Sequence, residues 1–405
     1  MRSYPIYTVT PKAEKSLRNG HPWVYGEEVV KKSETAPNGE LVDVRSGKGA
    51  YLGTGWVNDH SKILVRIIST NANDRFDEAF FDRRIRYALE YRQHVMGDDF
   101  KACRLIFGES DQFPGLVVDR FDDVLVVQSM SMGIEVRKAL IYRLLVENLR
   151  KMGQTVSAIY ERGDVATRTL EGLDQSCGFY AMDMLRCDLN GHVEIVENGI
   201  RFDVNYIDGQ KTGYFLDQKY NRLAVMKLAK GRRVLDCFTH TGAFALHASK
   251  GGAAHVTAVD ISQTAIDQAR ANAQRNGITD MEFVCANVFE LLTERYEKGI
   301  KSDDFIILDP PAFTKSHATA RDAYRGYKEI NLKAMRLLPR GGYLATCSCS
   351  HFMKEDMFVQ MLREAAHDAC VSLRQIEARQ QSPDHPILLN VPETNYLKFF
   401  LFQVV

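Results

Sequence analysis

The residues best suited to chemistry stand in three short segments in the second half of the chain, each at the end of an apolar run. The segments are Asp236–Gly242, which ends in a glycine turn, Asp309–Phe313, which begins Asp-Pro-Pro, and Thr346–Ser350, which contains two cysteines. Ligands of open α/β sheets bind beyond the carboxyl ends of the parallel strands. We therefore expect the three segments to converge on one crevice.

The elements that would position these segments alternate between strand and helix. Strands are predicted at Arg233–Asp236, Val256–Val259, Glu282–Cys285, Phe305–Leu308 and Gly342–Ala345, and helices over about 242–250 and 263–276. Strands separated by amphipathic helices predict a mostly parallel, Rossmann-like sheet. Residues 189–405 are therefore the predicted catalytic domain.

The polar residues beyond the first two strands suit a nucleoside cofactor. Asp260 lies about 20 residues past the glycine turn, where a carboxylate can accept hydrogen bonds from ribose hydroxyls. The turn has only Gly242 and lacks the G-x-G-x-x-G pattern of a pyrophosphate site, so a dehydrogenase is a weak alternative. A mononucleoside cofactor, an acidic turn and a cysteine in one crevice indicate methyl transfer to a nucleobase.

Length, composition and charge are those of an ordinary soluble protein. The chain has 405 residues, which is long enough for two or three domains. Of its residues, 45% are apolar and 26% are charged. It contains no apolar run of membrane-spanning length and no signal region at its start, so we expect a cytoplasmic protein with no membrane partner. A formal net charge of +0 argues against non-specific coating of long RNA but is compatible with local basic patches.

The cysteines are scattered, which fits a reducing compartment. The one close pair, Cys347 and Cys349, has no second pair or histidine run at zinc-site spacing. We therefore expect no metal site.

Residues 1–73 predict a small β-barrel with a basic segment. Strands are expected at Ile6–Val9, Glu40–Val44, Tyr51–Trp56 and Ile63–Ile68, separated by glycine turns. The first connection carries basic and aromatic residues, namely Lys12, Lys15, Arg18, His21 and Trp23. Cations beside an aromatic ring can hold phosphate and stack on a base. The alternative is a solvated helix followed by a core tryptophan, and for Trp23 we favour the core.

Residues 78–188 predict an α/β or α+β middle domain in which we find no chemistry. The pattern favours helices over Glu78–Met96 and 134–151, with strands between and after them. Farther along, Asn198-Gly199 predicts a hairpin turn. A polar, glycine-flanked loop then leads into a helix. Lys211 in this loop and Arg222 in the helix are candidate contacts to a cofactor or an RNA phosphate.

The motifs together resemble known families. The basic helix with Gly20–Tyr25 resembles the PUA fold, a small RNA-binding barrel. Residues from about 190 onward resemble class I S-adenosylmethionine-dependent methyltransferases. The whole chain resembles the ribosomal RNA large-subunit methyltransferase I family, which makes 5-methylcytosine. The matching segments are Asp236–Leu246, Asp309–Phe313, Arg325–Asn331, Ser348–Ser350, Lys211–Gly213 and Asp217-Gln218.

This resemblance implies a mostly parallel, seven-stranded sheet and S-adenosylmethionine as cofactor. The implied cofactor-binding residues are Asp236, Phe238, Thr239, His240, Thr241, Gly242, Asp260, Ile261, Asn287, Val288 and Asp309. The family usually has an acidic residue where Asn287 stands, and an amide is an uncharged, weaker acceptor for the adenine amino group. The implied substrate is large-subunit ribosomal RNA or a precursor, and the resemblance is compatible with a homodimer.

The chemistry explains the need for a cysteine. Carbon 5 of cytosine is a weak nucleophile until a thiolate adds to carbon 6. The resemblance places this thiolate on Cys349, whose pKa should be lowered by donors or positive charge, and leaves Cys347 a packing role. Asp309 would hold the amino group or ring nitrogen of the base. Phe313 is a candidate contact to the flipped base, and core packing would explain it as well. Lys315 and Lys328 are candidate phosphate contacts, and either could instead be a solvated surface charge.

Two other functions stay open at this point. An Asp-Pro-Pro motif also occurs in enzymes that methylate exocyclic base amines, which need no cysteine. A non-catalytic RNA-binding protein that retains the fold is the third hypothesis, with Asn287 as its best argument.

Overall fold

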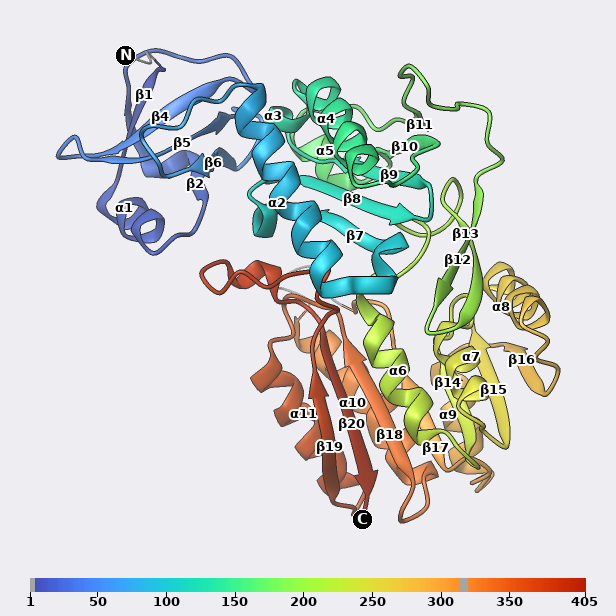
Figure 1. Cartoon of the computed structure of the whole chain (residues 1–405). Helices are drawn as coiled ribbons and strands as arrows, with labels where there is room; N and C mark the ends of the chain where they lie inside the picture. Colours follow the sequence, from blue (N-terminus) through green and yellow to red (C-terminus); the bar gives the residue numbers. More distant parts are fainter. Residues whose placement is uncertain (1–3, 314–319) are drawn as a thin grey trace. The chain divides into compact units, whose positions relative to one another are not determined.

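The computed structural model describes residues 4–313 and 320–405, grouped in two compact units (Figure 1). The first contains the described residues up to Ile195, together with Asp203–Leu216 and Pro383–Thr394. The second contains Val196–Phe202, Asp217–Ser382 and Asn395–Val405. The division into domains 1–73, 78–188 and 189–405 stays a prediction. Lys315 lies outside the described residues.

The N-terminal sheet of the first unit has six strands in the order β2-β6-β5-β4-β1-β3. Its elements are β1 (Ile6–Val9), α1 (Pro11–Arg18), β2 (Trp23–Tyr25), β3 (Val29–Lys32), β4 (Leu41–Ser46), β5 (Tyr51–Val57) and β6 (Ile63–Ser69). Tyr7, Val42 and Val65 are fully buried in its core. Trp23 is only half-buried and donates from Nε1 to Glu109 over 3.0 Å, so the core role expected for it is wrong in part. Trp56 is the tryptophan that is buried.

The second sheet of this unit is mixed, in the order β11-β10-β9-β8-β7. Its strands are β7 (Ala102–Phe107), β8 (Leu116–Phe121), β9 (Val124–Ser129), β10 (Ala158–Arg162) and β11 (Cys177–Phe179), with helices α2 (Glu78–Met96), α3 (Met132–Glu135), α4 (Lys138–Lys151) and α5 (Ala166–Leu170). Asp77 caps α2 by accepting from the Phe80 backbone N–H. The expected α+β arrangement is therefore present.

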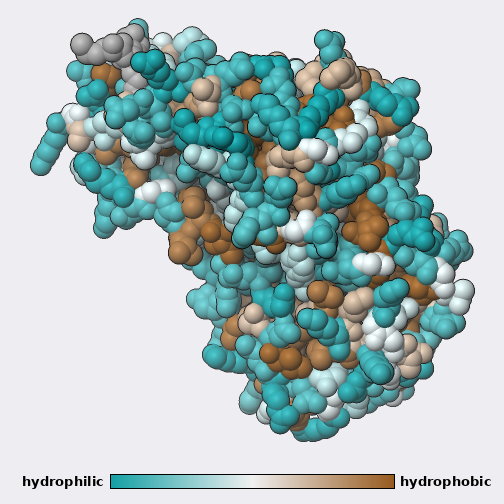
Figure 2. Space-filling model, viewed as in Figure 1, coloured by the Kyte–Doolittle hydropathy of each residue, from teal (hydrophilic) through white to brown (hydrophobic). Residues whose placement is uncertain are grey.

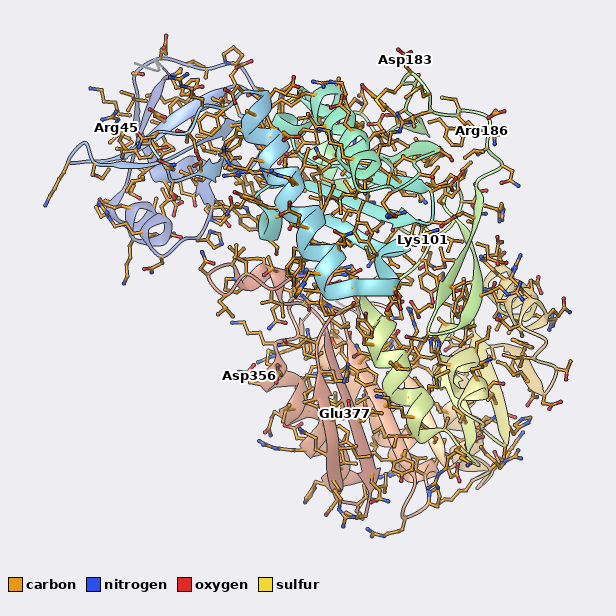
Figure 3. All side chains as sticks on the ribbon, in the orientation of Figure 1. Arg45, Lys101, Asp183, Arg186, Asp356 and Glu377 are labelled. Atoms are coloured by element: carbon orange, nitrogen blue, oxygen red, sulfur yellow. The ribbon has the colours of Figure 1, made fainter. Side chains whose placement is uncertain are left out.

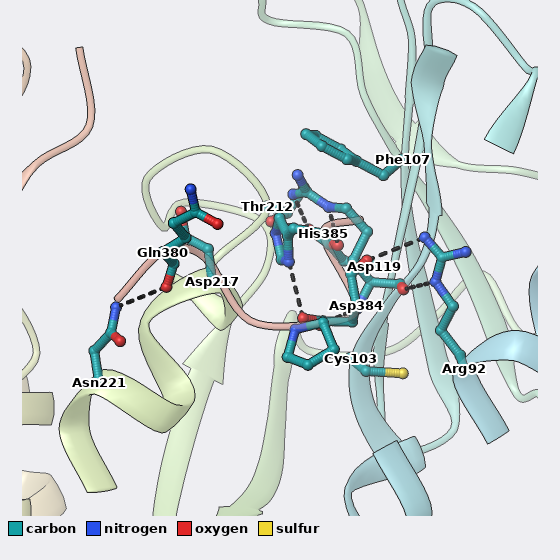
Figure 4. A network of polar contacts seen from close by, with 12 residues as sticks. Arg92, Cys103, Phe107, Asp119, Thr212, Asp217, Asn221, Gln380, Asp384 and His385 are labelled. Carbon is teal, nitrogen blue, oxygen red and sulfur yellow. Dashed lines mark hydrogen bonds and ion pairs between the residues drawn. The ribbon is translucent and has the colours of Figure 1, made fainter. Parts of the chain in front are cut away.

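Asp384 anchors the segment Pro383–Thr394 within the first unit (Figure 4). Its Oδ2 accepts from the Arg104 backbone N–H over 2.8 Å, and its carbonyl oxygen accepts from Arg92 over 3.0 Å. Asp119, beside them, accepts from Arg104 and from Thr212 Oγ1. A segment far along the chain is thus fixed to β7 by polar contacts.

The hairpin between β12 (His192–Glu197) and β13 (Ile200–Asn205) confirms the predicted Asn-Gly turn. Asn198 has φ 51° and Gly199 has φ 78°, the left-handed pair that a tight hairpin requires.

The second unit is built on a seven-stranded sheet in the order β16-β15-β14-β17-β18-β20-β19. Its strands are β14 (Arg233–Cys237), β15 (His255–Asp260), β16 (Met281–Cys285), β17 (Phe305–Leu308), β18 (Tyr343–Ser348), β19 (Leu373–Arg379) and β20 (Lys398–Val404). Its helices are α6 (Lys219–Leu228), α7 (Ala243–Lys250), α8 (Gln263–Arg275), α9 (Val288–Glu297), α10 (Ala320–Leu337) and α11 (Glu355–Asp368). Only β20 runs antiparallel to its two neighbours, which confirms the Rossmann-like, mostly parallel fold.

Alternation along the strands builds a core on each face of this sheet. Val234 and Ile307 belong to the cluster that includes residues of α6 and α7, whereas Leu235 and Ile306 belong to the cluster with α10 and α11. Strand β18 continues to Ser348 instead of ending at Ala345 as expected, so Cys347 lies on the strand.

Charged side chains of both signs extend from the ribbon (Figure 3), and the face in Figure 2 is largely hydrophilic with scattered hydrophobic patches. Among the described residues, no helix combines the length and apolar character that crossing a membrane requires.

Candidate active site

The parallel register brings the three chemistry-bearing segments to one edge of the sheet in the second unit. Cys237 is opposite Val259 and Leu308, and Leu308 is opposite Thr346. The residues that follow these positions therefore emerge together at the carboxyl ends of β14, β15, β17 and β18. This is the predicted crevice edge.

The turn after β14 is held in an unusual backbone conformation. Phe238, His240 and Gly242 have φ values of 64°, 51° and 83°, and two of these residues carry side chains that disfavour the left-handed region. The Thr239 N–H donates to the Val259 carbonyl over 2.9 Å, and the His240 N–H donates to Asp260 Oδ2 over 2.9 Å. The turn is therefore fixed to the end of β15.

Asp236 lies fully buried at the base of this turn. Its Oδ2 accepts from Thr239 Oγ1 over 2.6 Å, whereas its Oδ1 has no hydrogen-bond partner in the described part of the chain. Burial raises the pKa of Asp236 to about 7. A buried acceptor without a donor is costly, so the site fits a ligand that brings polar hydrogens.

The ends of β15 and β16 supply further polar groups. Asp260 Oδ1 accepts from the Ser262 N–H over 3.0 Å, and the neighbouring Ile261 is 71% exposed. Asn287 caps α9, with its Oδ1 accepting from the Phe289 N–H over 3.0 Å, and Val288 behind it is buried. The amide oxygen of Asn287 thus already accepts one backbone hydrogen bond.

Asp309 begins the Pro-Pro turn after β17. Its Oδ1 accepts from Gln218 Nε2 over 3.1 Å. Desolvation, followed by the nearby charge of Asp217, raises the pKa of Asp309 to about 6. This carboxylate can therefore change its protonation state near neutral pH.

The two cysteines of the third segment differ in exposure. Cys347 is fully buried among apolar side chains, and burial raises the pKa of its thiol well above the usual range. Cys349 follows the end of β18 and is half-buried. Only Cys349 therefore combines access with a position at the crevice edge.

Two residues beside Cys349 escaped sequence analysis as individual site residues. Tyr327 of α10 is fully buried, its hydroxyl accepts from Ser348 Oγ over 3.1 Å, and its ring lies 4.6 Å from that of Phe313. Lys398 is also buried and starts β20. A lysine at the head of the apolar run Phe399–Phe402 was the available signal.

Comparisons with known proteins agree with this geometry. Residues 162–403 match the family described as S-adenosylmethionine-dependent methyltransferase, and residues 8–70 match the PUA-like domain. A protein of Pseudoalteromonas translucida named ribosomal RNA large subunit methyltransferase I is 39% identical, covering 96% of this chain and 97% of its own. A protein of the same name from Photobacterium profundum is 40% identical over 98% and 99%. The chain belongs to the ribosomal RNA large subunit methyltransferase I family.

The fold of this methyltransferase is also found in a solved structure. A putative S-adenosylmethionine-dependent methyltransferase from Streptococcus mutans, 21% identical, has a TM-score of 0.82 and covers 98% of this chain and 100% of its own. The N-terminal PUA-like domain and the C-terminal methyltransferase domain are therefore established, and S-adenosylmethionine is the cofactor of the family.

Several RNA contacts expected in the methyltransferase domain have other partners. Arg222 is 2% exposed and donates to Glu197 Oε1 over 2.7 Å. Its contact to a phosphate stays a prediction. Lys328 of α10 pairs with Asp368 over 2.8 Å. Phe313 packs against the apolar core through Tyr327, which agrees with the core alternative as well as with a place beside the base.

In the first unit, the expected basic residues are accessible. Helix α1 buries Ala13 and Leu17, which turns Lys12, Lys15 and Arg18 to solvent. The remaining two expected contacts are the half-buried His21, which lies 3.3 Å from Glu393, and the exposed Lys211, whose ammonium lies over the Phe215 ring. Helix α1 thus presents three exposed basic residues, of which Lys12 pairs with Glu28 and Arg18 with Glu14. Their contact to RNA stays a prediction.

Proposed function

We propose that this protein transfers a methyl group from S-adenosylmethionine to carbon 5 of a cytosine in large-subunit ribosomal RNA, through an adduct between Cys349 and carbon 6. One observation carries the proposal. A half-buried cysteine stands at the carboxyl end of β18, at the same sheet edge as Asp309 and the glycine turn. The relatives are named as ribosomal RNA large subunit methyltransferases, and this chain matches them over nearly their full length. This supports ribosomal RNA as the substrate.

Cofactor binding falls to the segments at the ends of β14, β15 and β16. We assign the buried carboxylate of Asp236 and the turn Phe238–Gly242 to one side of the cofactor, and Asp260, Ile261, Asn287 and Val288 to its nucleoside. The orphaned Oδ1 of Asp236 supports this assignment. When bound, S-adenosylmethionine supplies an electrophilic methyl group.

The reaction uses Cys349 as nucleophile. Its thiolate forms the bond to carbon 6, and the electron pair of the ring double bond shifts to carbon 5. Carbon 5 would then take the methyl group as the bond between that group and the sulfonium sulfur breaks, leaving a neutral thioether. A base then takes the proton of carbon 5, the double bond re-forms, and the sulfur–carbon bond breaks to release the thiolate. Asp309, beside Gln218, holds the amino side of the base and favours charge build-up in the ring during addition.

Covalent trapping tests this proposal. RNA that contains 5-fluorocytosine should stay attached to the wild-type protein on a denaturing gel, because fluorine at carbon 5 blocks the final elimination. Cys349→Ser should give no such band. Cys347→Ser is the matched control, because it changes a buried thiol two positions away and should retain the band.

The alternatives predict different results. If Cys349→Ser still transfers methyl groups and no adduct forms, the methyl group is accepted by an exocyclic base amine. The Asp-Pro-Pro turn and Phe313 would also suit that reaction. If neither transfer nor cofactor binding is seen in the wild-type protein, the hypothesis of a non-catalytic RNA-binding protein is favoured.

A further inference from the structure

A buried lysine stands next to the proposed nucleophile, although it lies far from it in the sequence. Lys398 is directly opposite Ser348 in the antiparallel pairing of β18 with β20. Opposed residues project on the same face of a sheet. The Lys398 side chain therefore lies on the face of Ser348, the residue just before Cys349.

The ammonium group of Lys398 holds the turn that contains Cys349. Nζ donates to the carbonyl oxygen of Ser350 over 2.6 Å and to that of Tyr396 over 2.8 Å. Lys398 is only 5% exposed. One hydrogen bond thus ties β20 to the residue that follows the nucleophile.

A buried cation is expensive unless an anion compensates it. Two carbonyl dipoles satisfy hydrogen bonds but supply no formal charge. Burial lowers the pKa of Lys398 to about 8, and the charge that opposes this shift most is that of Cys349, followed by Glu355. A thiolate on Cys349, one residue before the Ser350 carbonyl that Nζ contacts, would supply such a charge.

Apart from the exposed His351, whose ring lies 5.5 Å from that of Tyr396, the other titratable groups near the thiol among the described residues bring no positive charge. Tyr327 faces it from α10, and burial raises the pKa of its phenol far above the ordinary value. Cys347 precedes it on β18, and Asp309 lies beside Cys347 at the end of β17. Glu355, at the start of α11, acts on Lys398. Each of these groups is neutral or negative near neutral pH.

We propose that Lys398 is a positioning residue that keeps Cys349 ionised and oriented, through its buried ammonium and its hydrogen bond to Ser350. This inference rests on the proposed function, in which Cys349 is the nucleophile. The proposal gives β20, the last strand along the chain, a part in activating the Cys349 thiolate.

Thiol alkylation measures this effect without RNA or cofactor. The rate at which iodoacetamide modifies Cys349 is followed against pH by peptide mass spectrometry, with the exposed Cys370 as internal reference. In wild-type protein the midpoint for Cys349 should lie below that for Cys370. Lys398→Gln, which keeps an N–H donor but removes the charge, should raise the Cys349 midpoint by about one pH unit. Its rate at neutral pH should fall roughly tenfold.

Two comparisons separate charge from structure. Lys398→Met removes both charge and donor and should shift the midpoint at least as far as Lys398→Gln. The buried Cys103 must stay unmodified in each variant, which verifies folding. If the Cys349 alkylation profile of Lys398→Gln equals that of the wild type, the proposal is refuted. It is also refuted, without any variant, if the Cys349 midpoint in the wild-type protein lies at or above the Cys370 midpoint.

The outcome is independent of the trapping experiment. If the Cys349 alkylation profile depends on Lys398 but no 5-fluorocytosine adduct forms, the proposed reaction is refuted and the role of Lys398 stands. If an adduct forms but the alkylation profile does not depend on Lys398, the reaction stands and the role of Lys398 is refuted.

Discussion

At the scale of single residues, burial decides the chemistry of the crevice. Asp236 and Asp309 have raised pKa values because they are withdrawn from water, and Cys347 is held as a neutral thiol for the same reason. Cys349 differs from Cys347 mainly in exposure and in the cation beside it. Position just past the end of β18, two residues after Cys347, therefore separates the proposed nucleophile from a buried thiol.

Asp236→Asn should change how stability depends on pH. The folded-state pKa of about 7 lies above the ordinary 3.8, so between these values the folded protein holds a proton that the unfolded chain has lost. The free energy of unfolding of the wild type should therefore fall as pH rises from 4 toward 7. The asparagine variant should lose this dependence and be more stable by about 1–3 kcal/mol at pH 8.

Urea unfolding at pH 5 and pH 8 measures this difference, with Asp174→Asn, a change at an exposed carboxylate, as control. Titration with S-adenosylmethionine should show weaker binding to Asp236→Asn. Equal pH dependence in Asp236→Asn and wild type would contradict the assigned cost of burying this carboxylate.

At the scale of elements, the turn between β14 and α7 depends on close packing as well as on backbone freedom. A Cβ at Gly242 would lie 2.7 Å from Leu246 Cδ1 and 3.0 Å from the Cβ of Ala269 on α8. The glycine thus allows α7 and α8 to approach the turn. The same turn presents the backbone groups that we assign to the cofactor.

Gly242→Ala should destabilise the protein more than a left-handed φ alone explains. We expect the free energy of unfolding to fall by about 2–4 kcal/mol, because φ strain and a clash add. The matched control is Gly252→Ala, with φ 85° but no atom closer than 3.7 Å to the added Cβ. It should cost about 1 kcal/mol. Similar urea midpoints for both variants would refute the packing argument.

At the scale of the whole molecule, the formal net charge of +0 leaves RNA affinity to local patches. Ion pairs cancel many surface cations in the described part of the chain, such as Lys101 with Asp122 and Arg186 with Asp188. Helix α1 exposes three cations, although Lys12 lies 3.4 Å from Glu28 and Arg18 lies 2.8 Å from Glu14. Pairs with an exposed cation contribute little, so phosphate can displace them. We therefore expect this helix to contribute to the salt dependence of RNA binding.

Replacing Lys12, Lys15 and Arg18 together by alanine should weaken RNA binding at all sequences alike. The slope of log affinity against log salt should become shallower by about two to three, since each phosphate contact releases roughly one counterion. Filter binding over a range of salt concentrations measures this slope. The exposed Lys151 of α4 gives a control, Lys151→Ala. An unchanged slope in the triple variant would exclude α1 as an RNA contact.

Local patterns in the sequence are enough to predict the strand–helix alternation of the second unit and the place of its motifs. Local apolar patterns specify Phe305–Leu308 as a strand with the same bounds as in the structure, and the polar residues after parallel strands must share an edge. Short-range patterning also predicted the Asn198-Gly199 hairpin. These features depend on neighbours in the chain, which a sequence displays directly.

Tertiary structure alone decided which distant side chains meet. The register of β18 with β20 places Lys398 beside the segment that contains Cys349, and Arg222 pairs with a buried carboxylate, Glu197. Asp384 is likewise anchored to β7, far from it in sequence. Such contacts depend on strand order and burial, and no local periodicity encodes either, because each emerges only when separated segments pack against one another.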